Sequence, residues 1–228
     1  MTFGHTMICV MAWLATAAIP ALAEPQFTPL AARYQEARGN GHAAPRSTEW
    51  FFTRNGNRVE IGRGDYVELW ERDQRAQVSW RRIFHADRKV VAYTPGQLRT
   101  IERELPWETL NTVYDAKHLL GHLKRVEETR WLDRPAARYA GKVGNQEVEV
   151  VWLEAEQLPA RIVRRDQLHT YLQLTLQELR PEPAQGWPRS DLSRAADYEE
   201  IDGADLGDRE YDPFVKKVLA MDGHGHAH

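Results

Sequence analysis

A regular alternation of apolar and polar residues between Ala136 and Leu179 constrains this fold most strongly. In the first run two groups of residues alternate along the chain. One group is Val148, Val150 and Trp152, and the other is Glu147, Glu149 and Val151. Pro159 then interrupts the ladder, because proline has no N–H to donate, and the run Arg161–Arg165 follows. A later run carries leucines of one parity, namely Leu168, Leu172, Leu174 and Leu176. Since successive side chains of a strand point to opposite faces, this stretch predicts antiparallel strands with one buried and one hydrated face.

Short strand-like runs also fill the first half of the chain. They are Thr48–Arg54, Arg58–Ile61, Tyr66–Arg72, Ala76–Phe84 and Lys89–Thr94, and two more follow at Arg125–Leu132 and Ala136–Val143. Asn55-Gly56 between the first two runs is a strong hairpin signal. Helices are expected at three places, Leu30–Arg38 before Gly39, Trp107–Leu123 behind Pro106, and Tyr211–Ala220.

This order of elements predicts a mostly β fold of the α+β class. A sheet of so many strands with so few helices has to curl, and its concave side is buried only if the helices lie across it. The expected architecture is therefore a curved antiparallel sheet, an incomplete β-barrel closed by helices. The space beneath helices that are free to move suits an apolar ligand.

The first 23 residues contain no Lys, Arg, Asp or Glu, and Ala21-Leu22-Ala23 forms a small-x-small cleavage site. This pattern predicts a secretory signal peptide cleaved after Ala23, and hence export to the periplasm. The chain then divides into the signal peptide at 1–23, a half-barrel domain at 24–180 and an acidic extended tail at 181–228. The tail is expected to contain a short helix and a histidine-rich end.

Cysteine usage and net charge exclude some alternatives. The sole cysteine, Cys9, lies in the signal peptide, so the mature chain has to be stabilised by its core and not by disulfides. The formal net charge of −3 argues against bulk nucleic-acid binding, which needs a strongly basic surface.

Several residues in the second half resemble a known family. They are the Tyr-x-Gly of Tyr139 and Gly141, then Val151, Trp152 and Glu154, then Leu158, Pro159 and Ile162. Over residues 28–180 the chain resembles the superfamily of LolA-type periplasmic lipoprotein carriers, LolB-type receptors and MucB/RseB-type regulators. This resemblance implies a LolA-like half-barrel that holds acyl chains or another hydrophobic group, as in outer-membrane lipoprotein sorting. Charged residues at presumed strand positions, such as Arg82 and Arg164, imply a smaller cavity than in a lipoprotein carrier.

Four aromatic residues are the candidates for ligand binding, namely Trp50, Phe52, Trp80 and Trp152. Rings of this kind either fill a core or line a concave pocket, and the pattern alone does not separate the two roles. The chain has no nucleophile elbow, phosphate-binding loop or dinucleotide fingerprint, so an enzyme is not expected.

The C-terminus carries three alternating imidazoles, His224, His226 and His228, on a Gly/Ala backbone. Such a tail can bind Zn²⁺, Cu²⁺ or Ni²⁺ weakly, or it is a polar terminus without a metal role. His118 and His122 lie four residues apart, but the intervening glutamate of a zinc-protease motif is missing. No other cofactor is expected.

The leading hypothesis is a non-catalytic periplasmic carrier whose partner is a hydrophobic ligand or the acyl chains of a lipoprotein. Peripheral contact with the envelope fits this role, whereas nucleic acid is not an expected partner. Two alternatives remain open: an envelope metal-binding or metal-delivery protein that uses the histidine tail, and a regulatory interaction module.

Overall fold

The computed structural model describes residues 27–39, 46–166, 170–188, 190 and 192–223. These residues form one twelve-stranded sheet in the order β12-β6-β5-β4-β3-β2-β1-β11-β10-β9-β8-β7. The strands are β1 Leu30–Arg38, β2 Arg46–Asn55, β3 Arg58–Arg63, β4 Tyr66–Arg72, β5 Val78–Phe84, β6 Lys89–Tyr93, β7 Lys124–Trp131, β8 Arg134–Val143, β9 Gln146–Leu153, β10 Leu158–Arg165, β11 Thr170–Pro181 and β12 Glu199–Asp202. Neighbouring strands are antiparallel except β12, which runs parallel to β6.

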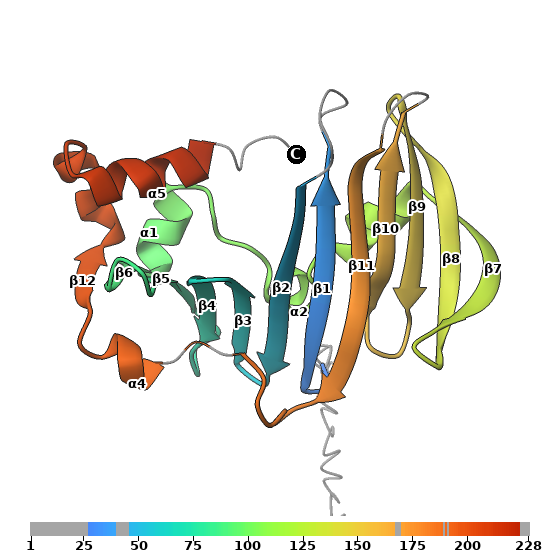
Figure 1. The fold of residues 1–228 in the computed structure, drawn as a ribbon, viewed down its shortest axis with the longest axis horizontal. Coiled ribbons are helices and arrows are strands. Elements are labelled where there is room, and N and C mark those ends of the chain that lie inside the picture. The colour runs from blue at the N-terminus through green and yellow to red at the C-terminus, as the bar shows by residue number, and fades with distance from the viewer. Residues whose placement is uncertain (1–26, 40–45, 167–169, 189, 191, 224–228) are drawn as a thin grey trace, which may run out of the picture.

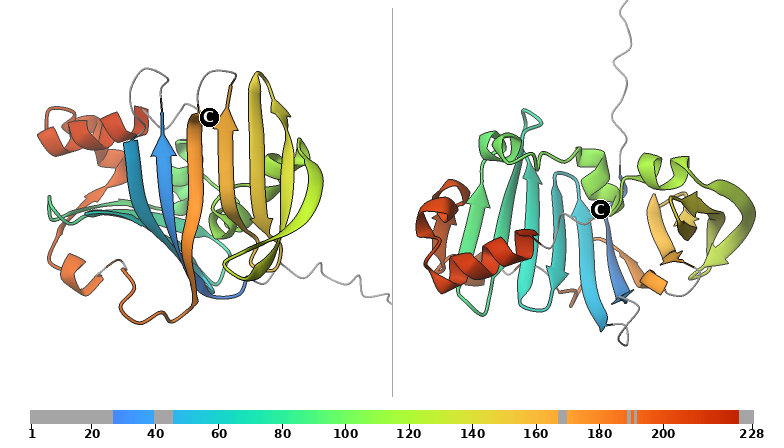
Figure 2. Two further views of the ribbon diagram at one scale, coloured as in Figure 1. Left: turned by 45° about the vertical axis from the view of Figure 1, so that its right-hand side comes forward. Right: turned by 90° about the horizontal axis from the view of Figure 1, so that it is seen from above.

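The sheet bends around three short helices (Figures 1 and 2). These are α1 Pro95–Thr100, α2 Trp107–Thr112 and α3 Ala116–Gly121, and the later segments are α4 Leu192–Ala195, the 3₁₀ helix η1 Gly203–Arg209 and α5 Pro213–Gly223. The edge strands β7 and β12 do not pair with each other, so the barrel stays open. The predicted mostly β, curved and open sheet is therefore confirmed. Among the described residues, no helix has the length and apolar character needed to cross a bilayer.

The main hydrophobic core lies on the concave face. Tyr34 of β1 pairs with Trp50 of β2, and Trp70 of β4 pairs with Trp80 of β5, so their rings share this face. One leucine from each short helix, Leu98, Leu110 and Leu119, is buried against the same core. The helices therefore close the hollow side of the sheet, as the pattern of elements predicts.

The helix expected at Leu30–Arg38 is wrong, because this segment is β1, a central strand between β2 and β11. Its composition favours a helix, but all nine residues pair with strands on both sides, with one register shift at Arg33/Tyr34. Ala31 and Ala32 are both fully buried on opposite faces, which a solvent-facing helix would not allow.

The continuous helix expected at Trp107–Leu123 is also wrong in extent. The chain forms α2 and α3 instead, and the helix breaks at Val113, whose φ is +68°. A β-branched residue with positive φ is unfavourable, so tertiary contacts have to impose this break.

Described residues beyond Pro181 fold back onto the sheet and are not extended. β12 pairs with β6, and Phe214, Val215 and Val218 of α5 enter the main core. The helix expected at Tyr211–Ala220 corresponds to α5 at Pro213–Gly223. This part of the chain therefore contributes to the core, although its composition is acidic.

Candidate functional site

All four aromatic residues singled out in the sequence lie in the concave core. Their exposed fractions are 2% for Trp50, 0% for Phe52, 2% for Trp80 and 5% for Trp152. Trp50 stacks on Tyr34 with ring centroids 4.6 Å apart. The structure thus brings the four together as walls of a packed interior, and contact with a ligand stays a prediction for each.

Three indole N–H groups in this core have no hydrogen-bond partner among the described residues. They belong to Trp50, Trp70 and Trp80, and each residue is at most 3% exposed. Buried indole N–H groups usually find an acceptor, and an unmade bond costs about 1–3 kcal/mol. The concave core therefore retains unused polar donors within an aromatic environment.

An open groove of about 480 Å³ lies at one rim of the concave face. Six of its lining residues are apolar, namely Phe27, Ala76, Val78, Leu105, Pro106 and Trp107, and three are charged, namely Arg72, Glu104 and Glu108. The groove separates the β4–β5 hairpin from the connection between α1 and α2. Leu105 is 41% exposed there, and Ile101 on the same connection is 44% exposed. The groove is therefore an apolar entrance beside the helices.

A second, more enclosed recess of about 120 Å³ lies on the convex face, with Thr53, Glu60, His85 and Ser190 among its lining residues. The Glu60 carboxylate already accepts hydrogen bonds from the Ser190 backbone N–H at 2.6 Å and its hydroxyl at 2.7 Å. It also lies 2.8 Å from Arg58 Nε. These contacts hold the segment after β11 against the convex face, so we place the candidate site at the larger groove.

The helices beside the groove are only marginally stable by themselves. Each of α1, α2 and α3 has six residues, well below the length of about 12–15 residues that an isolated helix needs. Their stability must come from the core leucines and from hydrogen bonds to the sheet. These helices therefore form a lid that is held by a small number of identifiable contacts.

Arg54 of β2 is the central contact between the lid and the sheet. Its Nη1 donates to the Asn111 carbonyl of α2 at 2.6 Å, and its Nη2 donates to the Glu156 carbonyl between β9 and β10 at 2.6 Å. Its Nε donates to the Thr28 carbonyl at 3.0 Å, and the residue is 1% exposed. Burial lowers the pKa of the Arg54 guanidinium to about 10, although Tyr34 and Glu156 oppose this shift. The group is thus charged at neutral pH and fastens three segments.

A second buried arginine fastens the end of α5. Arg82 is 2% exposed, and its Nη1 donates to Asp222 Oδ2 at 2.9 Å while its Nε donates to the Tyr66 hydroxyl at 3.1 Å. Arg103, from the connection after α1, lies 3.4 Å from the other oxygen of Asp222. Burial lowers the pKa of Arg82, but the charges of Tyr66 and Asp222 outweigh it and raise the pKa overall. Asp222 therefore links α5 both to the sheet and to the lid.

The sequence contains one signal that could have identified Arg54 and Arg82, namely their position in the two-residue alternation. Arg54 follows Trp50 and Phe52 at the same parity, and Arg82 follows Trp80. An arginine at the inward position of a strand has to find partners within the core. Its partners, however, lie far along the chain, 57 residues away for Asn111 and 102 for Glu156.

The structure leaves the predicted metal site untested, because His224, His226 and His228 lie outside the described residues. Within the described ranges, no group of three or more His, Cys, Asp or Glu side chains is arranged to hold a metal ion. The His118 and His122 rings lie 5.6 Å apart at the exposed end of α3, as a surface pair.

No protein-family model and no curated protein matches this sequence. Similar solved structures include PNGF-II, with 13% identity and a TM-score of 0.44 over 79% of this chain and 32% of that chain. They also include the MucA/MucB complex of Pseudomonas aeruginosa, with 16% identity and a TM-score of 0.38 over 72% of this chain and 54% of that chain. A LolA superfamily protein from Nitrosomonas europaea has 8% identity and a TM-score of 0.34 over 69% of this chain and 87% of that chain.

This chain thus spans about a third of PNGF-II and about half of the MucB chain. The folds found include the LolA and MucB folds that the sequence resembles. The open form of this sheet follows from its own strand order.

Proposed function

We propose that this chain is a non-catalytic binding protein of the periplasm that carries an apolar ligand, such as an acyl chain, beneath its short helices. The observation that supports this most directly is the apolar groove at the rim of the concave face, beside a lid of six-residue helices. The aromatic core begins directly behind the lid. Export rests on the leader pattern at 1–23, which lies outside the described residues.

The ligand would enter by replacing lid side chains on the concave face. Leu98, Leu110 and Leu119 each contribute about 2 kcal/mol by burial, or about 6 kcal/mol together. A buried methylene contributes about 0.8 kcal/mol, so about eight methylenes would offset the loss of all three leucines. An acyl chain of ordinary length therefore suffices to exchange with the lid, because the concave face stays covered in both states.

Arg54 gives this exchange a defined barrier. To move α2 away from the sheet, the bond from Arg54 Nη1 to the Asn111 carbonyl has to break. The bonds to Thr28 and Glu156 would persist, so the guanidinium would remain partly satisfied in the open state. The closed state is thus favoured without ligand, and the open state needs the ligand's apolar surface.

Uptake of N-phenyl-1-naphthylamine, which fluoresces in apolar surroundings, tests the proposal. A charge placed in the groove by Leu105→Asp should weaken uptake about tenfold, because an unpaired carboxylate in an apolar site costs more than 1.4 kcal/mol. Leu132→Asp is the matched control, since Leu132 is 45% exposed and does not line the groove. No uptake by the unmodified protein, or equal loss in both variants, would refute a ligand site in the groove.

A further inference from the structure

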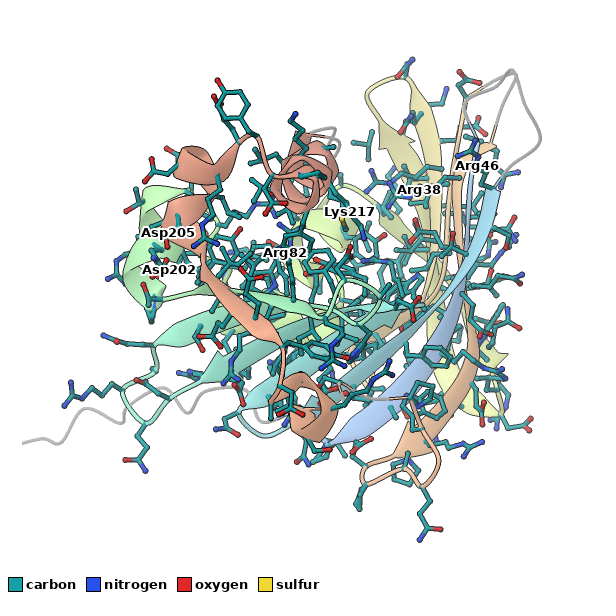
Figure 3. All side chains as sticks on the ribbon, turned by 60° about the vertical axis from the view of Figure 1, so that its left-hand side comes forward. Arg38, Arg46, Arg82, Asp202, Asp205 and Lys217 are labelled. Atoms are coloured by element: carbon teal, nitrogen blue, oxygen red, sulfur yellow. The ribbon has the colours of Figure 1, made fainter. Side chains whose placement is uncertain are left out.

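Three arginines form a row across neighbouring strands, at the opposite end of β1 from the groove. Arg38 of β1 pairs with Arg46 of β2 on one side and with Leu172 of β11 on the other, and Leu172 pairs with Arg164 of β10. Paired strands lie about 4.8 Å apart, so the row from Arg46 to Arg164 is about 15 Å long. Figure 3 shows Arg38 and Arg46 close together at the ends of their strands.

The arginine row belongs to the concave face. Arg38 has the parity of Tyr34, Arg46 that of Trp50, and Arg164 that of Ile162, all of them buried in the main core. Trp50 and Ile162 are at most 2% exposed, whereas Arg38 and Arg46 are exposed. The face therefore changes from charged at this end to apolar within a few residues.

Among the described residues, only one member of the row has an acidic partner. Arg38 contacts the Glu36 carboxylate, but Arg46 and Arg164 have no ion pair with any residue that the structure describes. Arg164 Nε is buried and has no hydrogen-bond partner within the described ranges. A desolvated guanidinium donor without an acceptor is unfavourable, and an anion at this position would satisfy it.

Tyr114, from the connection between α2 and α3, covers this end of the core. Burial raises the pKa of its phenol, Glu36 raises it further, and Arg38, Arg164 and Arg63 oppose the shift. The phenol is therefore neutral at physiological pH and lies within electrostatic reach of two members of the row. It is an additional hydrogen-bond donor beside the arginines.

We propose that Arg38, Arg46 and Arg164 form an anion site for the phosphate or carboxylate head group of an amphiphile whose chain lies toward the concave core. The chain part of this inference rests on the proposed function, whereas the anion part rests on the arginine row alone. Guanidinium groups bind such oxyanions through paired N–H donors. The charged rim would bind the head group of the amphiphile, and the apolar interior next to it would bind the chain.

Three probes separate the contributions of head and chain. Palmitoyl lysophosphatidic acid has both, monopalmitoylglycerol lacks the phosphate, and glycerol 3-phosphate lacks the chain. Binding is measured by calorimetry below the critical micelle concentration, at two salt concentrations. We expect the lysophosphatidic acid to bind at least about tenfold more tightly than the neutral lipid, with a preference that falls as salt rises.

The variants are Arg164→Gln and Arg46→Gln, with Arg165→Gln as the matched control. Arg165 follows Arg164 in β10 but points to the other face, and it is exposed. Each row variant should weaken lysophosphatidic acid binding about fivefold and leave monopalmitoylglycerol unchanged. The control should leave both unchanged, and thermal unfolding should confirm that all three variants fold.

Equal affinity for the charged and neutral lipids, or the same loss in Arg165→Gln as in Arg164→Gln, overturns the anion site and leaves the proposed function standing. If neither lipid binds, the proposed function fails. Glycerol 3-phosphate binding that Arg164→Gln abolishes would then uphold the anion site with a soluble phosphate ester as its ligand. If glycerol 3-phosphate does not bind either, the anion site is overturned as well.

Discussion

Replacement of Arg54 by methionine tests whether this side chain holds the lid closed. Methionine keeps most of the length and apolar volume of the arginine stem but removes all three donated hydrogen bonds. Thr28 is exposed, so its carbonyl can bind water, whereas the Asn111 and Glu156 carbonyls lose their Arg54 donor. Residue Asn111 is 1% exposed, so its carbonyl is poorly placed to recover a partner.

The expected loss follows from two opposing effects. Two unsatisfied carbonyls cost about 1–3 kcal/mol each, or about 2–6 kcal/mol together. Removal of a buried cation recovers part of this, because the guanidinium no longer has to be desolvated. We expect a net loss of about 2–4 kcal/mol, concentrated at α2. The stability of Arg54→Lys should lie between that of the unmodified protein and that of Arg54→Met, since an ammonium group cannot reach all three carbonyls.

Hydrogen exchange of the α2 amides, Trp107–Thr112, is the direct measurement. A local loss of 2 kcal/mol or more should speed their exchange by about 30-fold, while amides of β4 change less. Uptake of N-phenyl-1-naphthylamine should become faster in the same variant. Arg81→Met is the control, because Arg81 pairs with Glu71 at 2.9 Å on the convex face. Unchanged exchange at α2, or equal acceleration throughout the sheet, would refute the assignment of Arg54 as the lid contact.

Three further outcomes follow from other parts of the molecule. Asp212 accepts a hydrogen bond from the Phe214 N–H at 2.7 Å. This bond lowers the pKa of Asp212 most, and the charge of Lys89 lowers it further. Its stabilisation is therefore complete above about pH 4 and lost as pH falls through the lower folded pKa, so Asp212→Asn should reduce the Tm at pH 7 but not at pH 2. A Cβ on Gly203 would lie 2.3 Å from Tyr93 Cδ1, so Gly203→Ala should destabilise by about 1–3 kcal/mol in urea unfolding, whereas Gly207→Ala, with nothing within 4 Å, should be tolerated. Calorimetry with Zn²⁺ tests the predicted tail site at His224, His226 and His228: binding should disappear in a chain that ends at Gly223, and equal binding by both chains would dismiss the tail.

The strand pattern was predictable wherever a two-residue period coincided with a strong turn. The β2–β3 turn does form at this signal: Asn55 ends β2, Gly56 and Asn57 form the turn, and Gly56 has a φ of +58°. The alternation at Val148, Val150 and Trp152 does form β9, with these residues on the concave face. In these segments the local preference and the tertiary environment favour the same structure.

The failures occurred where tertiary contacts override local preference. The segment at β1 has two adjacent alanines and no β-branched residue, so its strand pairing depends entirely on β2 and β11. The break between α2 and α3 lies between Leu110 and Leu119, which are both buried in the main core, and Arg54 of β2 donates to the Asn111 carbonyl from 57 residues away. Neither environment can be deduced from the local sequence.

The groove was not predictable from the sequence, because none of the four aromatic candidates lines it. Trp50, Phe52, Trp80 and Trp152 were expected as core or pocket residues; they are buried in the concave core, and their contact with a ligand stays a prediction. The groove combines residues from β4, β5, α2 and the α1–α2 connection, and the arginine row combines residues from β1, β2 and β10. Their proximity follows from the strand order. Strand order depends on long-range pairing, for which a single sequence carries little information.

Parallel pairing of β12 with β6 also affects how the molecule behaves toward copies of itself. β6 carries Val90 and Val91 and would be an unprotected outer strand without β12. An unprotected strand offers free amide and carbonyl groups to any passing chain. The acidic C-terminal segment therefore covers this edge, and a protein shortened at residue 181 should self-associate through β6.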